Sequence, residues 1–115
     1  MADLRREGDE LVLELTAFEK AESVHGDIRV PAAAIRSIEI VNDAMGALHG
    51  VRAPGTGVPG VIAVGTWRTA REKQFAVLHH DTHRAVRVVL EGAEWNELLV
   101  GSHDPEAVVA ELTRT

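Results

Sequence analysis

The sequence predicts a mainly β fold in which seven short strands form a small barrel or a strongly bent sheet, with a C-terminal α-helix over its open end. Three observations support this prediction. Successive short segments alternate between apolar and polar side chains, which is the pattern of half-buried strands. Glycine, proline, asparagine and aspartate stand between these segments and favour turns. The residues after Asp104 instead place apolar side chains at intervals of three and four, which is typical of a helix.

The first half of the chain contains three predicted strands, at residues 11–18, 24–30 and 35–41. Their inward faces carry Leu11, Leu13 and Leu15 in the first strand, Val24, Ile28 and Val30 in the second, and Ile38 and Ile40 in the third. Pro31 ends the second strand because it has no amide hydrogen for the ladder, and a short alanine turn follows it. After the third strand, Asn42 and Asp43 favour a turn or the cap of one helical turn starting near Met45.

The second half contains four further predicted strands, at residues 61–67, 75–79, 86–90 and 98–100. Turns are expected between them at residues 69–72, 80–83 and 92–93, the first two as hairpin tips. A final helix of about ten residues is expected after them. Asp104 suits its N-cap, and Pro105 suits the first helical position, where a missing amide hydrogen costs little. Val108, Val109 and Leu112 share one face of this helix and are expected to plug the open end of the barrel.

A glycine- and proline-rich segment interrupts the strand pattern at residues 49–68. It holds five of the ten glycines, together with Pro54 and Pro59. Pro-Gly occurs twice, and each pair favours a type II turn in which glycine takes a positive φ. A long loop in a small domain often carries function, and the alternative is a structural loop that covers one end of the core. The segment matches neither of the nucleotide-binding motifs GxxxxGK[ST] and GxGxxG.

Composition limits the class of protein. The 115 residues predict a single domain, residues 1–115, with a core from about Leu11 to Leu112. The chain has no cysteine, which excludes disulfides, and its charged start without a secretory apolar segment favours a cytoplasmic location. No apolar run approaches the length of a membrane helix, and the net charge of −6 argues against nucleic-acid binding. Ten arginines against two lysines suggest a GC-rich bacterial genome.

The charge is uneven along the chain. Residues 1–50 carry a net charge of −5, residues 51–87 carry +4, and residues 88–115 carry −5. The basic third begins in the glycine- and proline-rich segment. A local positive patch can attract an anion even to an acidic protein, and the alternative is a set of solvated hairpin charges.

Residues 28–40, with the sequence IRVPAAAIRSIEI, are similar to the V-P-x-x-x-I-x-x-I-x-I turn of bacterial pleckstrin-homology (PH)-like proteins. The predicted strand at residues 61–69 and the helix start at residues 104–108 also resemble small uncharacterised bacterial proteins of this kind. The resemblance extends from about Leu11 to Leu112. It implies a bent barrel of seven antiparallel strands capped by a C-terminal helix.

The resemblance also implies a binding module, with no cofactor expected. PH-like domains mostly bind phosphoinositides or protein segments, and the bacterial members often form oligomers. Phosphoinositide-binding members carry several basic residues around the loop between their first two strands. This chain offers Lys20 and Arg29 there, beside Glu19 and Glu22, so phosphoinositide binding is not expected.

The ligand-binding residues predicted from the sequence are His49, Arg52, Gly55, Thr56, Gly57 and Arg68. A histidine and an arginine beside exposed backbone amides can hold a phosphate or a carboxylate. His49 also suits acid–base chemistry, since the ordinary pKa of histidine is about 6.5, but no nucleophile motif accompanies it. Two functions therefore stay open: a non-enzymatic binding or assembly module, and a small-anion-binding protein or enzyme that uses this segment.

The other histidines and the tryptophans have competing interpretations. His79, His80 and His83 lie near Asp81, but neighbouring strand residues point to opposite sides, so a solvated turn is expected in place of a metal site. The two tryptophans, at positions 67 and 95, are expected to fill the core, although either could anchor an interface.

A homo-oligomer is predicted through an edge strand at residues 35–41. Short strands leave edges whose backbone groups need covering. Ile35, Met45 and Leu48 supply apolar surface in and just after this strand. A self-complementary contact of this edge would give a two-fold dimer.

Overall fold

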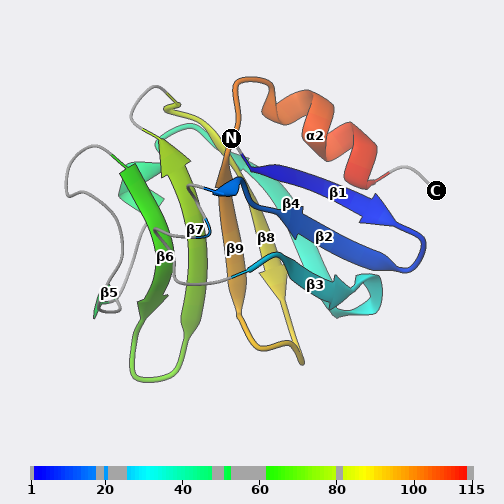
Figure 1. Cartoon of the computed structure of the whole chain (residues 1–115), viewed down its shortest axis with the longest axis horizontal. Coiled ribbons are helices and arrows are strands. Elements are labelled where there is room, and N and C mark those ends of the chain that lie inside the picture. The colour runs from blue at the N-terminus through cyan, green and yellow to red at the C-terminus, as the bar shows by residue number, and fades with distance from the viewer. Residues whose placement is uncertain are drawn as a thin grey trace.

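The computed structural model describes residues 2–17, 20, 26–47, 51–52, 62–79 and 82–113, with the backbone alone at residues 45, 51, 52 and 62–64. Its strands form a three-stranded sheet in the order β1-β2-β3 and a six-stranded sheet in the order β4-β8-β9-β7-β6-β5 (Figure 1). The strands are β1 Asp3–Glu7, β2 Glu10–Glu14, β3 Ile28–Pro31, β4 Ile35–Val41, β5 Val51–Arg52, β6 Ile62–Arg68, β7 Lys73–His79, β8 Ala85–Leu90 and β9 Glu97–Gly101. Two 3-10 turns, η1 Ala32–Ala34 and η2 Met45–Ala47, and the helix α2 Pro105–Leu112 complete the described elements. The mainly β fold with a C-terminal helix is confirmed.

Strand β1 is an addition to the predicted elements. It pairs antiparallel with β2 through the tight turn Gly8-Asp9, in which Gly8 has a φ of 61°. Glycine reaches this left-handed region without the steric cost that a Cβ imposes. The apolar pattern does not reveal β1 because it is rich in charge and Leu4 is its one buried residue.

Strand β9 lies between β7 and β8, antiparallel to β8 and parallel to β7. The predicted hairpin at residues 80–83 is therefore wrong, because β7 and β8 are not neighbours. The six-stranded sheet is likewise not wholly antiparallel, and over the described residues the two sheets do not close into a barrel. All five residues of β9 are buried, as a central strand requires. Alternation predicts which face a side chain takes, but it does not predict which strand lies alongside.

The other described turns follow the sequence. Pro31 is the last residue of β3, and η1 comes directly after it. Asp43 caps η2 by accepting a hydrogen bond from the Gly46 amide at 3.2 Å. The β6–β7 turn is closed by the Thr69 amide, which donates to the Glu72 carbonyl at 2.9 Å.

The main core lies between the two sheets and under α2. Its most buried side chains are Leu11, Leu13, Phe75, Val77, Val86, Val88 and Leu98. Helix α2 packs against β1, β4 and β8, and its Leu112 is 2 % exposed. Asp104 accepts a hydrogen bond from the Ala107 amide, so the predicted N-cap is confirmed. No helix among the described residues has the length and apolar character needed to span a membrane.

A smaller apolar cluster occupies the opposite face of the six-stranded sheet. It consists of Ala44, Trp67, Ala76, Leu78, Ala85 and Leu99. Ala44 and Ala47, at the start and end of the segment containing η2, pack against this face. The Ala44 amide also donates to the His83 carbonyl at 2.9 Å. We call this the outer face of the sheet, because the core between the sheets covers the other one.

Candidate functional site

The structure describes only some of the residues predicted to bind a ligand, and these lie on adjacent strands. Strand β5 pairs with the end of β6, so that Val51 lies opposite Arg68 and Arg52 lies opposite Trp67. Two predicted site residues, Arg52 and Arg68, therefore stand on adjacent strands, one step apart in the ladder. The remaining four predicted positions, His49, Gly55, Thr56 and Gly57, lie outside the described residues.

The turn after β6 is tightly organised. The Thr69 hydroxyl oxygen accepts hydrogen bonds from the Glu72 amide at 2.9 Å and from the Arg71 amide at 3.4 Å. A threonine that bonds to the backbone two or three residues later fixes a turn in this way. Arg68 and Arg71 flank this threonine, and both side chains are exposed. We call Arg68 and Arg71 the basic corner.

The basic corner differs from most of the described arginines. Arg5, Arg29, Arg36, Arg84 and Arg87 each form an ion pair with at least one carboxylate. Arg36, for example, donates from Nε and Nη2 to the two carboxylate oxygens of Glu91 at 2.9 and 2.8 Å, which lowers the pKa of the Glu91 carboxyl. Arg6, Arg68 and Arg71 have no acidic partner among the described residues. Two of these three cations belong to the basic corner, where Arg68 lies opposite Val51 of β5.

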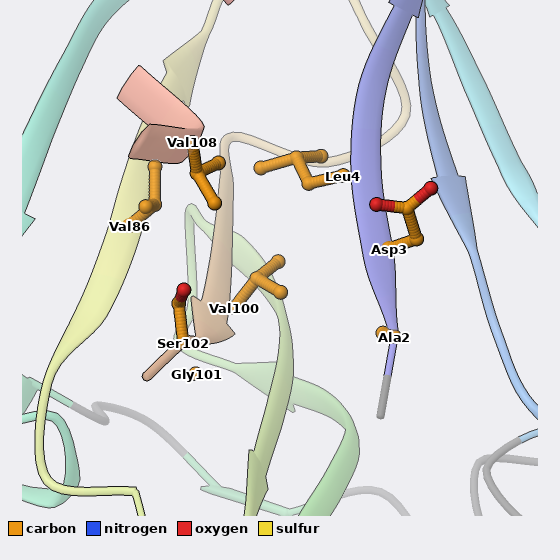
Figure 2. Close-up of a pocket in the computed structure, with 8 residues that line it drawn as sticks. All are labelled: Ala2, Asp3, Leu4, Val86, Val100, Gly101, Ser102 and Val108. Atoms are coloured by element: carbon orange, nitrogen blue, oxygen red, sulfur yellow. The ribbon is translucent and has the colours of Figure 1, made fainter. Parts of the chain in front are cut away.

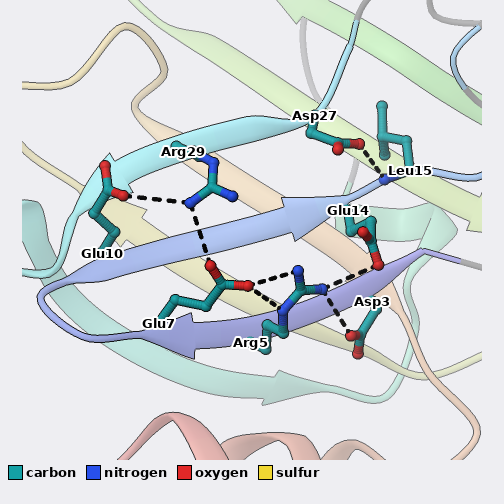
Figure 3. Close-up of polar contacts among 8 residues, drawn as sticks. All are labelled: Asp3, Arg5, Glu7, Glu10, Glu14, Leu15, Asp27 and Arg29. Carbon is teal, nitrogen blue, oxygen red and sulfur yellow. Dashed lines mark hydrogen bonds and ion pairs between the residues drawn. The ribbon is translucent and has the colours of Figure 1, made fainter.

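Charged side chains cover the solvent face of the three-stranded sheet (Figure 3). The Arg5 guanidinium contacts Asp3 at 3.1 Å, Glu7 at 2.6 Å and Glu14 at 3.1 Å. Arg29 contacts Glu7 at 3.4 Å and Glu10 at 3.3 Å. The bond from Arg5 is the main reason why the pKa of Glu7 is lowered.

Ion pairs also occupy the basic residues that a phosphoinositide would need to contact. Arg29 is held by Glu7 and Glu10, and the Lys20 ammonium lies 3.6 Å from the Asp27 carboxylate. These are the two bases that the sequence offers near the first predicted loop. Because each already faces a carboxylate, a phosphate would have to compete with a partner that is covalently tethered nearby.

The outer face of the six-stranded sheet carries a buried polar row that the sequence analysis does not identify. Gln74 and Glu97 are 1 % and 8 % exposed, and the Gln74 amide group donates to the Glu97 carboxylate. The same Gln74 nitrogen donates to the Ala47 carbonyl at 3.2 Å. Arg87 lies 4.0 Å from Glu97 and 2.6 Å from Glu39. The sequence does contain a pattern that could have revealed this row, because two polar residues stand at outward-facing positions of otherwise apolar strands.

A small pocket of about 60 Å³ lies at the end of the core (Figure 2). Leu4, Val86, Val100 and Val108 converge on it from β1, β8, β9 and α2, and Asp3 and Ser102 stand at its margin. Pockets that hold metabolites usually measure about 300–1,000 Å³. This space suits a single small apolar group and is far too small for a substrate.

The tryptophans are core residues, as expected. Trp67 is 8 % exposed on the outer face, and Trp95 is 4 % exposed in the main core. Trp95 packs edge-on against Phe75 with 5.6 Å between ring centroids, and the Lys73 ammonium lies 5.1 Å from its ring. Among the described residues, no three histidine, aspartate or glutamate side chains gather as a metal site requires. His80 and Asp81 lie outside the described residues.

The structure describes some of the residues predicted to form the dimer interface. Ile35 begins β4, is half-buried and packs against the main core. Met45 begins η2, where the backbone alone is described, and Leu48 lies outside the described residues. Strand β4 is an end strand of its sheet, as the prediction required.

Comparison with known proteins yields no relative. No family model, curated protein or solved structure matches this chain.

Proposed function

We propose that this protein is a non-enzymatic binding module of the PH-like class, which takes an anionic ligand at the basic corner. The observation that carries the proposal is the contrast between Arg68 and Arg71 and the arginines held by carboxylates. A carboxylate that pairs with an arginine offsets its charge, so that arginine attracts a further anion less strongly than an arginine without an acidic partner does. An exposed arginine without such a partner presents its donors to solvent and to anything that binds from solvent.

The location of the basic corner supports the proposal further. Arg68 ends β6 directly beside β5, and β5 carries Arg52. Arg52 and Arg68 therefore lie on adjacent strands, and Arg71 lies in the turn that follows β6. The protein has a net charge of −6, so this corner is a local exception that can orient an approaching anion.

Inorganic phosphate is the probe that tests this function. Titration of the labelled protein with phosphate should shift amide resonances of residues 68–72 more than those of β1 or α2. Arg68→Glu and Arg71→Glu should each weaken binding by about tenfold or more, the effect of losing one charge-assisted hydrogen bond. Arg6→Glu is the matched control, because Arg6 is also exposed and has no described acidic partner but lies in β1. Equal losses for all three variants would indicate general charge attraction and contradict a site.

The assembly alternative rests on β4. This strand pairs with β8 on one side, and its other side pairs with no strand in the described part of the chain. An open edge can pair with a second copy, and a C2 dimer is the commonest result. The register shift between Ile35 and Ser37 interrupts the strand near one end, so its regular part for such a contact is residues 37–41.

A further inference from the structure

The polar row on the outer face contains a link between distant parts of the chain. Gln74 is the second residue of β7, an interior strand of the sheet, and Ala47 ends η2. The Gln74 amide nitrogen has two hydrogens, and it donates one to the Ala47 carbonyl and one to Glu97. A carbonyl and a carboxylate both only accept, so this surrounding selects one orientation of the amide group.

The position of Gln74 ties this link to the proposed site. In the ladder, Gln74 lies opposite Trp67, and Trp67 lies opposite Arg52 on its other side. Ala47 and Arg52 are thus each joined to one of two neighbouring residues: Ala47 by a hydrogen bond to Gln74, and Arg52 by strand pairing to Trp67. Glu97 completes the arrangement from β9, where it pairs with Gln74 in the parallel register.

We propose that Gln74 and Glu97 form a clamp that fixes η2 on the outer face and thereby, close before β5 in the chain, limits where β5 can lie beside the basic corner. Gln74 is a positioning residue in this arrangement, and its effect on the ligand rests on the proposed function. Glu97 contributes by orienting the amide, and Arg87 faces the carboxylate from β8 while remaining bound to Glu39. A buried polar network of this kind specifies one arrangement only when its members are satisfied together.

Amide hydrogen exchange tests the clamp without any ligand. The double variant Gln74→Leu/Glu97→Leu removes both partners, so it leaves no buried charge unpaired and should remain folded. The Ala47 and Gly46 amides should then exchange roughly five- to tenfold faster, the change expected from one net hydrogen bond. Amides of β8 and β9 should keep their rates. If the double variant does not fold, Gln74→Met/Glu97→Gln replaces it, because this variant also leaves no buried carboxylate without its partner.

Two comparisons make this result specific. Glu97→Gln keeps an acceptor oxygen for Gln74 and should retain slow exchange at Ala47. Arg36→Leu/Glu91→Leu removes a cross-strand polar pair that does not touch η2, and it should also leave Ala47 unchanged. Unchanged exchange at Ala47 in the clamp variant, or an equal increase throughout the sheet, would overturn the clamp.

Phosphate titration separates the clamp from the proposed function. The clamp variant should bind phosphate several-fold more weakly than the wild type, although Arg68 and Arg71 are intact. If the wild type binds phosphate and the clamp variant binds it equally well, the positioning role fails while the function stands. If the wild type binds no phosphate, the proposed function fails, and the exchange rates still decide whether the clamp exists.

Discussion

Val12 illustrates how charged residues determine burial in this protein. It lies opposite Arg5 and Arg29 in the three-stranded sheet, on the solvent side, yet it is 1 % exposed. Long arginine side chains cover apolar neighbours with their aliphatic stems while the guanidinium groups stay in contact with water. The carboxylates around Arg5 and Arg29 hold those stems in place. The ion pairs of this face therefore contribute through packing as well as through charge, which alone is weak at a surface.

Asp27 should make stability depend on pH. Its carboxylate accepts a hydrogen bond from the Leu15 amide at 2.8 Å, which is the main reason why its pKa is lowered, and Lys20 adds to the effect. A lowered folded-state pKa stabilises the protein at neutral pH, and this stabilisation is lost as the pH falls through that pKa. Asp27→Asn keeps an oxygen for Leu15 but cannot ionise. It should melt below the wild type at pH 7, and the gap should narrow as the pH falls below the ordinary aspartate pKa of about 3.9 and close once the pH is below the lowered pKa of Asp27.

Thermal melts from neutral to acidic pH measure this gap. Asp9→Asn, which changes an exposed aspartate in the β1–β2 turn, is the control and should leave the melting temperature nearly unchanged at every pH. A gap between Asp27→Asn and wild type that stays constant as the pH falls would contradict the assignment.

Among the elements, α2 closes the space between the two sheets. It contacts β1 from one sheet and β4 and β8 from the other. Val108 and Val109 are partly buried against the main core, and Leu112 is fully enclosed. Arg84, which precedes β8, forms an ion pair with Glu106 and lowers the pKa of that carboxyl. The helix is therefore joined to the six-stranded sheet by both apolar and charged contacts.

Truncation before Asp104 should unfold or aggregate the protein. Burying a valine or leucine side chain fully is worth roughly 1.5–3 kcal/mol, and domains of this size have a total stability of only about 5–15 kcal/mol. Loss of Leu112 and two partly buried valines therefore removes a large share. Circular dichroism during heating should show no cooperative transition. A soluble truncated protein that melts cooperatively would show that α2 is an appendage.

Over the whole molecule, charge and shape together decide what the surface can bind. The molecule measures 38 × 29 × 25 Å along its principal axes. The β1–β2 turn and the β6–β7 turn lie toward opposite sides of it (Figure 1). The ion-paired face of the three-stranded sheet and the basic corner are thus separate surfaces.

Self-association through β4 is tested at the level of the whole molecule. Light scattering at micromolar concentration should give the mass of a dimer. Ile40→Lys should unfold the protein, since Ile40 is half-buried opposite Val86 of the main core. Met45→Glu should yield a folded monomer, because Met45 is predicted to lie in the contact. A strictly monomeric wild type would remove the assembly alternative and leave the ligand proposal.

The sequence by itself determined the local structure of most described elements. Alternation of Leu11, Leu13 and Leu15 predicts which side chains face the core, and all three are buried. Pro31, Asp43 and Asp104 predict where elements end or begin, because a missing amide hydrogen or a capping carboxylate acts within a few residues. Such short-range effects leave a signature in one stretch of sequence.

Only the tertiary structure decided which strands lie side by side and which charges are already paired. The placement of β9 between β7 and β8 depends on contacts between residues far apart in the chain, and no local pattern encodes it. The candidate site shows the same division. The basic third of the sequence pointed to Arg52 and Arg68, but the sequence alone does not tell Arg68 and Arg71 from the arginines that carboxylates hold. Pairing of Gln74 with Glu97 and Ala47 likewise arises only when three separate elements meet on one face of the sheet.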